Sequence, residues 1–164
     1  MSFSDEILNY HCPRWDEFPD IDLYMDQVVN ILEKNLNIFE DSYSGKIITS
    51  SMINNYVKQK VVKPPVNKKY DRVHLAYLFV VCTLKRVMSI PEICKGIEVA
   101  LQKYDISRIY DIFCDEFEMA LKNTFTCKED TTISSDTPKE LLLIKTAVGS
   151  VAKLEFAHYL INNK

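Results

Sequence analysis

Four hydrogen-bonding side chains with no carboxylate among them lie close together between positions 54 and 59. They are Asn54, Asn55, Lys58 and Gln59. On an α-helix they fall within about 140° of one another, because successive residues are about 100° apart. Apolar side chains occupy the opposite side. Amides can bond adenine edges in pairs and an ammonium can reach guanine or a phosphate, so this helix face suits a DNA major groove. An ordinary solvated helix face is the alternative.

The segment after this helix adds lysines at a turn. Pro64-Pro65 ends the helix, because proline lacks an N–H and restricts the residue before it. Residues 66–70 then predict a short β wing whose lysines lie beside the polar helix face. We expect phosphate contacts from Lys46, Lys58, Lys63, Lys68, Lys69 and Arg72. Asn54, Asn55 and Gln59 would read base edges.

Charge is segregated along the chain, although the net charge is only −3. Residues 1–45 carry two basic and ten acidic residues, whereas residues 46–95 carry ten basic and two acidic ones, a net charge of +8. A dense basic segment inside an acidic protein favours a local site for a polyanion. The alternative is a solvated basic face that pairs with the acidic N-terminal segment.

The elements that must position these residues are helices. Apolar residues spaced by three and four predict helices over 22–39, 51–60, 71–87, from 89 onward, over 107–125 and from 137 to about 162. Asp71 is expected to cap the third of these, which is apolar nearly all round and therefore central. His74 on it is expected to be a scaffold residue. Trp15 and Phe18 are expected to dock an N-terminal arm. The sequence predicts an all-α fold with one small β wing.

Several function classes have little support in the composition. The chain has only three glycines, at 45, 96 and 149, too far apart for a phosphate-binding loop. No apolar stretch approaches the roughly 20 residues that a bilayer requires, and no signal peptide is expected. The five cysteines are odd in number and widely spaced, which indicates reduced thiols and a cytoplasmic location. The spacing of His and Cys predicts no metal site, and no catalytic constellation or cofactor is expected.

The segment "SSMINNYVKQKVVKPPVNKKYDRVHLAYLFVVCTLKRVMSIPEI" resembles a winged helix-turn-helix of the MerR type. Tyr56 matches its recognition-helix aromatic, Val61-Val62-Lys63-Pro64 its helix exit, and Lys69-Tyr70 its wing. More closely, "DLYMDQV", "MINNYVK", "KKYDRVHLAYL" and "LKRVMSI" are similar to an uncharacterised bacterial family, domain of unknown function 1836. This second resemblance covers about residues 20–95 and implies a DNA-binding regulator.

The chain departs from the MerR pattern at specific positions. Asn54 stands where that type usually has arginine, Lys60 where a glycine ends the helix, and Lys68 where the wing has an aromatic. A separation of about ten residues, 40–49, replaces the tight turn between the first two helices. The resemblance therefore implies the motif without its base preference.

Together these observations predict a cytoplasmic regulator of double-stranded DNA with three parts. Residues 1–21 would form an arm, 22–95 a MerR-like winged helix-turn-helix module, and 96–164 a helical region with a long last helix that supplies a homodimer or partner surface. The alternative is a protein-interaction adaptor with Tyr56, Val62 and Val66 as its apolar anchor. A further alternative is an effector pocket lined by Phe113, Phe117, Phe125 and Phe156, although aromatics at this spacing favour a core.

Overall fold

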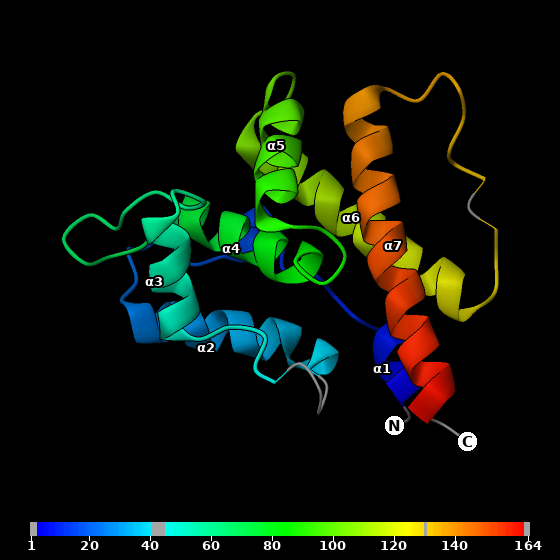
Figure 1. The fold of residues 1–164 in the computed structure, drawn as a ribbon, viewed down its shortest axis with the longest axis horizontal. Coiled ribbons are helices and arrows are strands. Elements are labelled where there is room, and N and C mark those ends of the chain that lie inside the picture. The colour runs from blue at the N-terminus through cyan, green and yellow to red at the C-terminus, as the bar shows by residue number, and fades with distance from the viewer. Residues whose placement is uncertain (1–2, 41–44, 130, 163–164) are drawn as a thin grey trace.

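The protein is built from helices that are arranged around one central helix (Figure 1). The computed structural model describes residues 3–40, 45–129 and 131–162. Within them lie seven α-helices and no strand; the helices are α1 Phe3–Leu8, α2 Met25–Leu36, α3 Ser50–Lys58, α4 Arg72–Leu84, α5 Ile90–Leu101, α6 Ile106–Phe125 and α7 Lys139–Asn162. Short 3₁₀ turns occupy Trp15–Glu17 and Asn37–Phe39. The all-α prediction is confirmed, as is the long last helix: α7 has 24 residues and is about 36 Å long.

Helix starts follow the capping signals in the sequence. The Asp71 carboxylate accepts a hydrogen bond from the His74 amide at 3.1 Å and so caps α4, as predicted. At α5 the Ser89 amide donates to the Glu92 carboxylate at 2.8 Å, which completes a capping box. These local bonds satisfy amides that no earlier turn of helix can reach.

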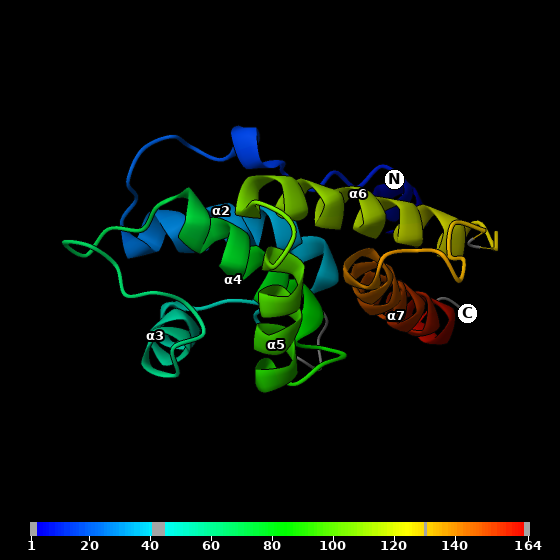
Figure 2. The same ribbon diagram turned by 90° about the horizontal axis from the view of Figure 1, so that it is seen from above.

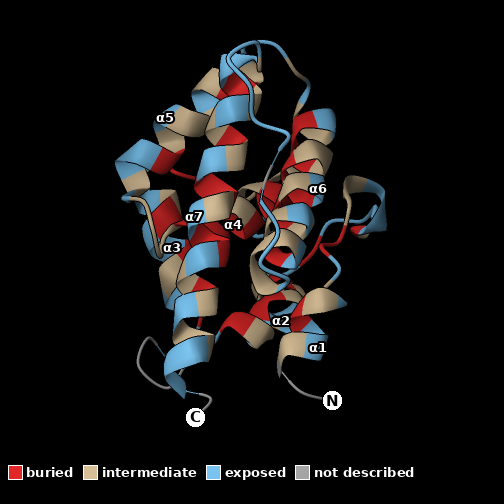
Figure 3. Cartoon of the chain, turned by 90° about the vertical axis from the view of Figure 1, so that its right-hand side faces the viewer, coloured by how far each residue is buried: buried red, intermediate tan, exposed pale blue. Residues whose placement is uncertain are grey.

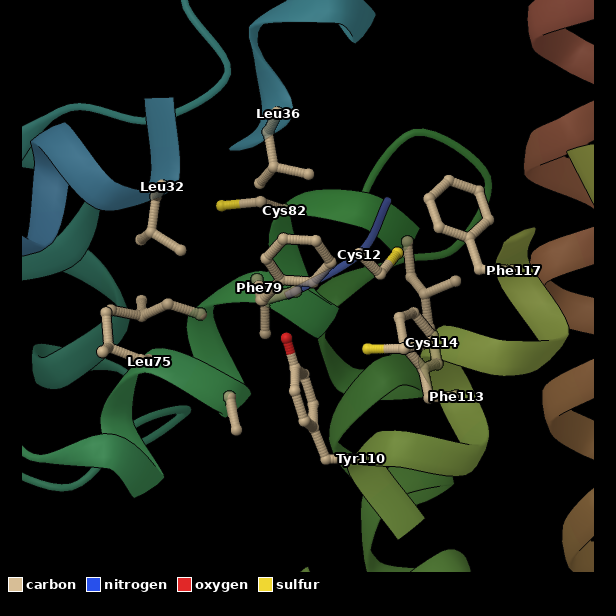
Figure 4. Packing of buried hydrophobic residues seen from close by; sticks show 14 of the residues in the cluster. Cys12, Leu32, Leu36, Leu75, Phe79, Cys82, Tyr110, Phe113, Cys114 and Phe117 are labelled. Atoms are coloured by element: carbon tan, nitrogen blue, oxygen red, sulfur yellow. The ribbon is translucent and has the colours of Figure 1, made fainter. Parts of the chain in front are cut away.

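Helix α4 is the centre of the core, as its apolar composition predicts. Leu75, Leu78, Phe79 and Cys82 are inaccessible to solvent. Figure 4 shows Phe79 between residues of α2 and residues of α6, with the segment around Cys12 beside them. One cluster of buried residues runs from the N-terminal helices to α7, so both halves of the chain share a core.

Helices α6 and α7 form the other large packing unit. Figure 3 shows buried residues along the sides of the two helices that face each other, with exposed residues on their outer sides. Phe117 and Val148 are completely buried there. The rings of Phe125 and Phe156 meet edge to face at 5.1 Å. Phe113 and Phe117 belong to the core cluster. These aromatics are therefore mainly packing residues, in agreement with the core interpretation.

The N-terminal arm is more structured than the sequence predicts, because it contains α1 and the 3₁₀ turn at 15–17. It lies along α6. The Tyr110 hydroxyl donates to the Pro13 carbonyl at 2.8 Å, and the Trp15 amide donates to Asp111 at the same distance. Phe18 is buried with its ring 5.4 Å from that of Tyr110. Trp15 and Phe18 thus dock the arm, as predicted.

The polar segments 40–46 and 126–136, which lie between the helices predicted from the sequence, fall partly outside the described residues. None of the helices in the described ranges combines the length and the apolar character that a membrane span requires.

Candidate nucleic-acid interface

Helix α3 is held by its apolar face. Ile53 is completely buried and Tyr56 is only 8% exposed. Thr49 caps the helix by accepting a hydrogen bond from the Met52 amide at 3.2 Å. Figure 2 shows α3 on the side of α2 and α4 that is remote from α6. Because one face is anchored, the opposite face must point away from the core.

That opposite face carries the four side chains singled out in the sequence. Asn54, Asn55, Lys58 and Gln59 are all exposed. Within the described parts of the chain, none of these side chains forms a hydrogen bond or an ion pair. No Asp or Glu occurs between residues 42 and 70, so the face and the segment after it contain no carboxylate. The amides and the ammonium are therefore free to meet an external ligand.

The helix ends in a left-handed residue that is not glycine. Lys60 has φ +59°, the Lys60 amide donates to the Val57 carbonyl at 3.0 Å, and the Val61 amide donates to the Tyr56 carbonyl at 2.9 Å. This is the hydrogen-bond pattern that usually places glycine at the helix end. The Lys60 side chain is exposed and adds a cation beside Lys58. Lys60 differs from the glycine of the MerR pattern, and its place in the site was not predicted from the sequence.

The predicted wing at 66–70 is a tight turn in the structure. Val66 and Lys69 exchange backbone hydrogen bonds of 3.0 and 2.9 Å, and the two residues between them, Asn67 and Lys68, have φ of +51° and +62°. Tyr70 pairs in the same way with Leu23, through two bonds of 2.8 Å. These are isolated bridges, not strands. The loop carrying the turn extends from the body of the molecule (Figure 1).

The turn presents cations supported by an aromatic ring. Lys68 is exposed at the tip, and the Lys69 ammonium lies over the Tyr24 ring, 5.3 Å from its centroid. Val66 is 73% exposed next to them. Tyr24 was missed by sequence analysis, since only the Leu23–Tyr70 pairing brings it to the turn.

His74 joins the base of the loop to α4. Its ring is buried, with Nδ1 3.0 Å from the Asp71 amide and Nε2 3.4 Å from the Pro64 carbonyl oxygen. Partial burial raises the pKa of Asp71, but hydrogen bonds from the His74 amide and ring outweigh burial and hold that pKa below its ordinary value. The scaffold role predicted for His74 is confirmed.

Two cations predicted to meet phosphates have partners within the chain. The Lys46 ammonium forms an ion pair with Glu33 at 2.7 Å, and this hydrogen bond raises the pKa of Lys46. Arg72 donates to the Phe18 carbonyl at 3.1 Å and faces the Trp15 ring at 5.9 Å. For these two cations the structure agrees with the alternative in which the basic segment pairs with the acidic N-terminal segment: Glu33 holds Lys46, and Asp16 and Asp20 lie 3.7 and 3.8 Å from Arg72.

Further cations of the basic segment are also used internally. Lys85 donates to the Ile47 carbonyl, and Arg86 donates to Phe39 and pairs with the buried Glu155. Six lysines of the segment remain: Lys95 is exposed on α5, and the other five lie at the end of α3 and on the loop after it. We define these five, Lys58, Lys60, Lys63, Lys68 and Lys69, as the basic strip. Within the described residues no ion pair involves any of these five lysines.

The family comparison identifies the chain at the level of family. The model described as "Domain of unknown function (DUF1836)" matches residues 13–113, and the protein belongs to this family. The match begins at Pro13 in the arm and ends within α6, so it includes the whole basic strip and its support. No curated protein and no solved structure matches the chain.

In the described part of the chain, no three His, Cys, Asp or Glu side chains are grouped so that they could hold a metal ion. All five cysteines are free. The chemistry this surface offers is therefore hydrogen bonding by amides and charge attraction by lysines.

Proposed function

We propose that this DUF1836 protein is a DNA-binding regulator of the winged helix-turn-helix type, with α3 in the major groove of double-stranded DNA. The observation that carries the proposal is the exposed face of Asn54, Asn55, Lys58 and Gln59, which has no internal partner among the described residues. Amides at such positions can bond base edges, while lysines on the same face contact phosphates.

The turn at 66–69 would act as the wing. Lys68 and Lys69 lie on the loop that leaves α3, so they can contact the backbone flanking the groove that α3 occupies. Tyr24 beneath Lys69 limits the freedom of that side chain. A held cation loses less conformational entropy when it meets a phosphate.

Internal pairing changes the expected strength of the electrostatic contribution. Six phosphate contacts per protomer would give a log-salt slope near −5. With Lys46 and Arg72 engaged inside the chain, four of the predicted contacts remain, and Lys60 adds a fifth lysine to the strip. Five contacts correspond to a slope of about −4.5.

The test is a titration of a labelled mixed-sequence duplex at several salt concentrations, followed by fluorescence anisotropy. Replacing Lys68→Ala and Lys69→Ala together is expected to lower affinity about tenfold or more near 0.1 M salt and to make the slope shallower by about 2. The matched control, Lys139→Ala with Lys153→Ala, removes two exposed lysines of α7 and should leave both quantities unchanged. A response that is flat in salt, or equal losses in both double variants, would reject the proposal.

Base reading is tested separately from backbone binding. Asn55→Ala is expected to reduce discrimination between selected duplexes while leaving the salt slope as it was, because amides release no counterions. Selection of duplexes from a random pool with the wild-type protein supplies the sequences for this comparison. If the selection enriched no sequence, the protein would bind only the DNA backbone.

The adaptor alternative loses its predicted anchor in the structure. Tyr56 and Val62 are only 8% and 3% exposed, so of the three residues only Val66 is on the surface. An acidic protein partner would have to bind the lysines with little apolar contact. The duplex titration described above also tests the adaptor alternative, because a protein-binding adaptor would not bind the duplex at all.

We also propose that the protein acts as a homodimer through its C-terminal helices. Leu160 and Ile161 near the end of α7 are 59% and 69% exposed, and Met119 on α6 is 40% exposed. Two copies would let two weak half-site contacts add. Light scattering after gel filtration tests this: a mass of one chain, 19.1 kDa, at all concentrations and with DNA present would reject it.

A further inference from the structure

Two adjoining cavities lie behind the basic strip, and the functions proposed above do not use them. The larger one is a groove of about 770 Å³ between the exit of α3, the start of α4 and the end of α5. The smaller one, which we call the inner cavity, has a volume of about 80 Å³ and is lined by residues of α4, α5, α6 and α7. Its lining is apolar, from residues such as Val80, Ala100 and Ile144.

The two spaces share part of their walls. Tyr77, Ile97, Leu101 and Ile106 line both of them. The two spaces therefore adjoin at these four side chains. A groove of this size with an apolar floor and a few polar groups has the dimensions of a small-molecule site.

Two carboxylates of the groove belong to residues that are next, in the sequence, to residues lining both spaces. Glu98 follows Ile97 and Asp105 precedes Ile106, and both acidic residues line the groove and are exposed. Among the described residues neither carboxylate has an ion-pair partner. Tyr77 and Tyr104 line the groove as well, and their ring faces can attract a cation.

The other charges of the groove lie on different elements. Lys60 and Lys63 line it from the exit of α3, and Asp71 from the start of α4. His74 is there too, but its ring is occupied by the Asp71 amide and the Pro64 carbonyl. Lys103, which lies between Glu98 and Asp105 in the sequence, forms an ion pair with Glu140 at 3.2 Å.

We propose that this double cavity binds a small amphiphilic amine, with its ammonium group between Glu98 and Asp105 and its apolar tail in the inner cavity. The cationic head follows from the two unpaired carboxylates and the tyrosine rings. The apolar tail follows from the lining of the inner cavity. Its volume of about 80 Å³ is about half that of an apolar cavity that takes up benzene, so it accepts the end of an alkyl tail while the rest of the tail lies in the groove.

The test compares three molecules that share one tail: hexylamine, hexanol and hexanoate. Each is titrated into the full-length protein without DNA, and binding is followed by NMR through the amide signals of residues 97, 98, 105 and 106. Hexylamine is expected to bind at least tenfold more tightly than hexanoate, with hexanol between them. From butylamine to hexylamine, affinity should rise about fourfold per methylene. Equal affinity for the three molecules, or shifts spread over the whole surface, would overturn the proposal.

Variants locate the head and the tail separately. Glu98→Gln with Asp105→Asn should lower hexylamine affinity at least fivefold and leave hexanol unaffected. The Asp105 side chain forms no capping hydrogen bond at the start of α6, and asparagine is equally favourable at that position, so α6 should be unaffected. The control Glu6→Gln removes an exposed carboxylate of α1 and should change nothing. Ala100→Leu fills the inner cavity and should abolish the gain from butylamine to hexylamine. If its folding is impaired, the carboxylate variant alone decides.

These measurements use no DNA, so they can fail while the DNA-binding proposal stands, and the reverse also holds. A link between the two is measurable afterwards, because Lys60 and Lys63 belong to both the basic strip and the groove. Unchanged hexylamine affinity in the Glu98 and Asp105 double variant would count against the site whatever the DNA result.

Discussion

The protein uses positive charge in two contrasting ways. Where the arm meets α6, the Arg14 guanidinium donates three hydrogen bonds within the chain. It donates to Glu118 at 2.7 Å, to Asp115 at 2.7 Å and to the Cys12 carbonyl at 2.6 Å. In the basic strip, by contrast, the lysines have no ion-pair partner among the described residues. The first region holds the fold together, whereas the second is left open.

Burial explains the difference. The side chain of Arg14 is 24% exposed and that of Glu118 is 16% exposed, so these charges have lost most of their water and need partners. An exposed lysine keeps its hydration and costs little when it is left unpaired. Unpaired exposed cations can therefore serve an external anion without weakening the fold, and the predictions below separate the two regions on this basis.

Breaking the arm's attachment should have the largest effect. Arg14→Ala removes three hydrogen bonds. Among the described residues it leaves the Glu118 carboxylate with the hydrogen bond from the Cys12 amide and the contact with His11 Nδ1 at 3.3 Å. The free energy of unfolding is expected to fall by about 3 kcal/mol, because one partner of a mostly buried charge pair is lost. Denaturant unfolding followed by circular dichroism measures the change.

The matched control for Arg14→Ala is Lys63→Ala in the basic strip. It should change the unfolding free energy by less than about 0.5 kcal/mol, since its ammonium is exposed. Equal destabilisation by the two variants would remove the distinction between the regions.

Arg72 is a sharper case, because it lies in the basic segment of the sequence but contacts the arm. Its guanidinium holds the Phe18 carbonyl and lies beside Trp15, and it is 3.7 Å from Asp16. Arg72→Ala is expected to lower the unfolding free energy by roughly 1–2 kcal/mol and to leave the salt slope of duplex binding unchanged. If the slope became shallower by about 1, Arg72 would instead be a phosphate contact of the DNA-binding surface.

Acid should weaken the arm's attachment through Glu118. Partial burial raises the pKa of this carboxyl, but hydrogen bonds from Arg14 and the Cys12 amide outweigh it and hold the pKa below its ordinary value of 4.5. A group whose pKa is lowered on folding stabilises the protein above its unfolded pKa, and this contribution is lost as the pH falls through the folded pKa. The free energy of unfolding should therefore decline below about pH 4.5, and less steeply in Glu118→Gln. Parallel pH profiles for the two proteins would contradict the assignment.

Local patterns predict the helices well and the long-range pairings poorly. The spacing of apolar residues places α3 and α6 within two residues of their observed bounds, because each helix buries one face. The exposed polar face of α3 follows from the same spacing. In contrast, the contacts of Arg72 with Phe18 and of Arg14 with Glu118 join residues 54 and 104 positions apart, which no local pattern encodes.

The wing prediction lies between these cases. Pro64 and the polar residues after it indicate a turn, and the turn is there with left-handed residues at 67 and 68. Strands do not form in the described structure, because only Leu23 and Lys69 offer partner backbone to this loop, each through a single isolated bridge. The helix-to-DNA geometry implied by the family resemblance stays a prediction until binding is measured.

The smallest expected effect separates charge from backbone strain within the basic strip itself. Lys60 has a left-handed backbone, which glycine adopts without a steric penalty, so Lys60→Gly should raise the free energy of unfolding by about 0.5–1 kcal/mol. Lys58→Gly removes the same charge two residues earlier, inside α3, and should lower that free energy by roughly 1 kcal/mol. Thermal unfolding of the two variants gives the sign of each change. Both variants should weaken duplex binding to a similar extent, because each lacks one ammonium group of the basic strip. If only the destabilised variant, Lys58→Gly, bound more weakly, α3 would act only as part of the scaffold.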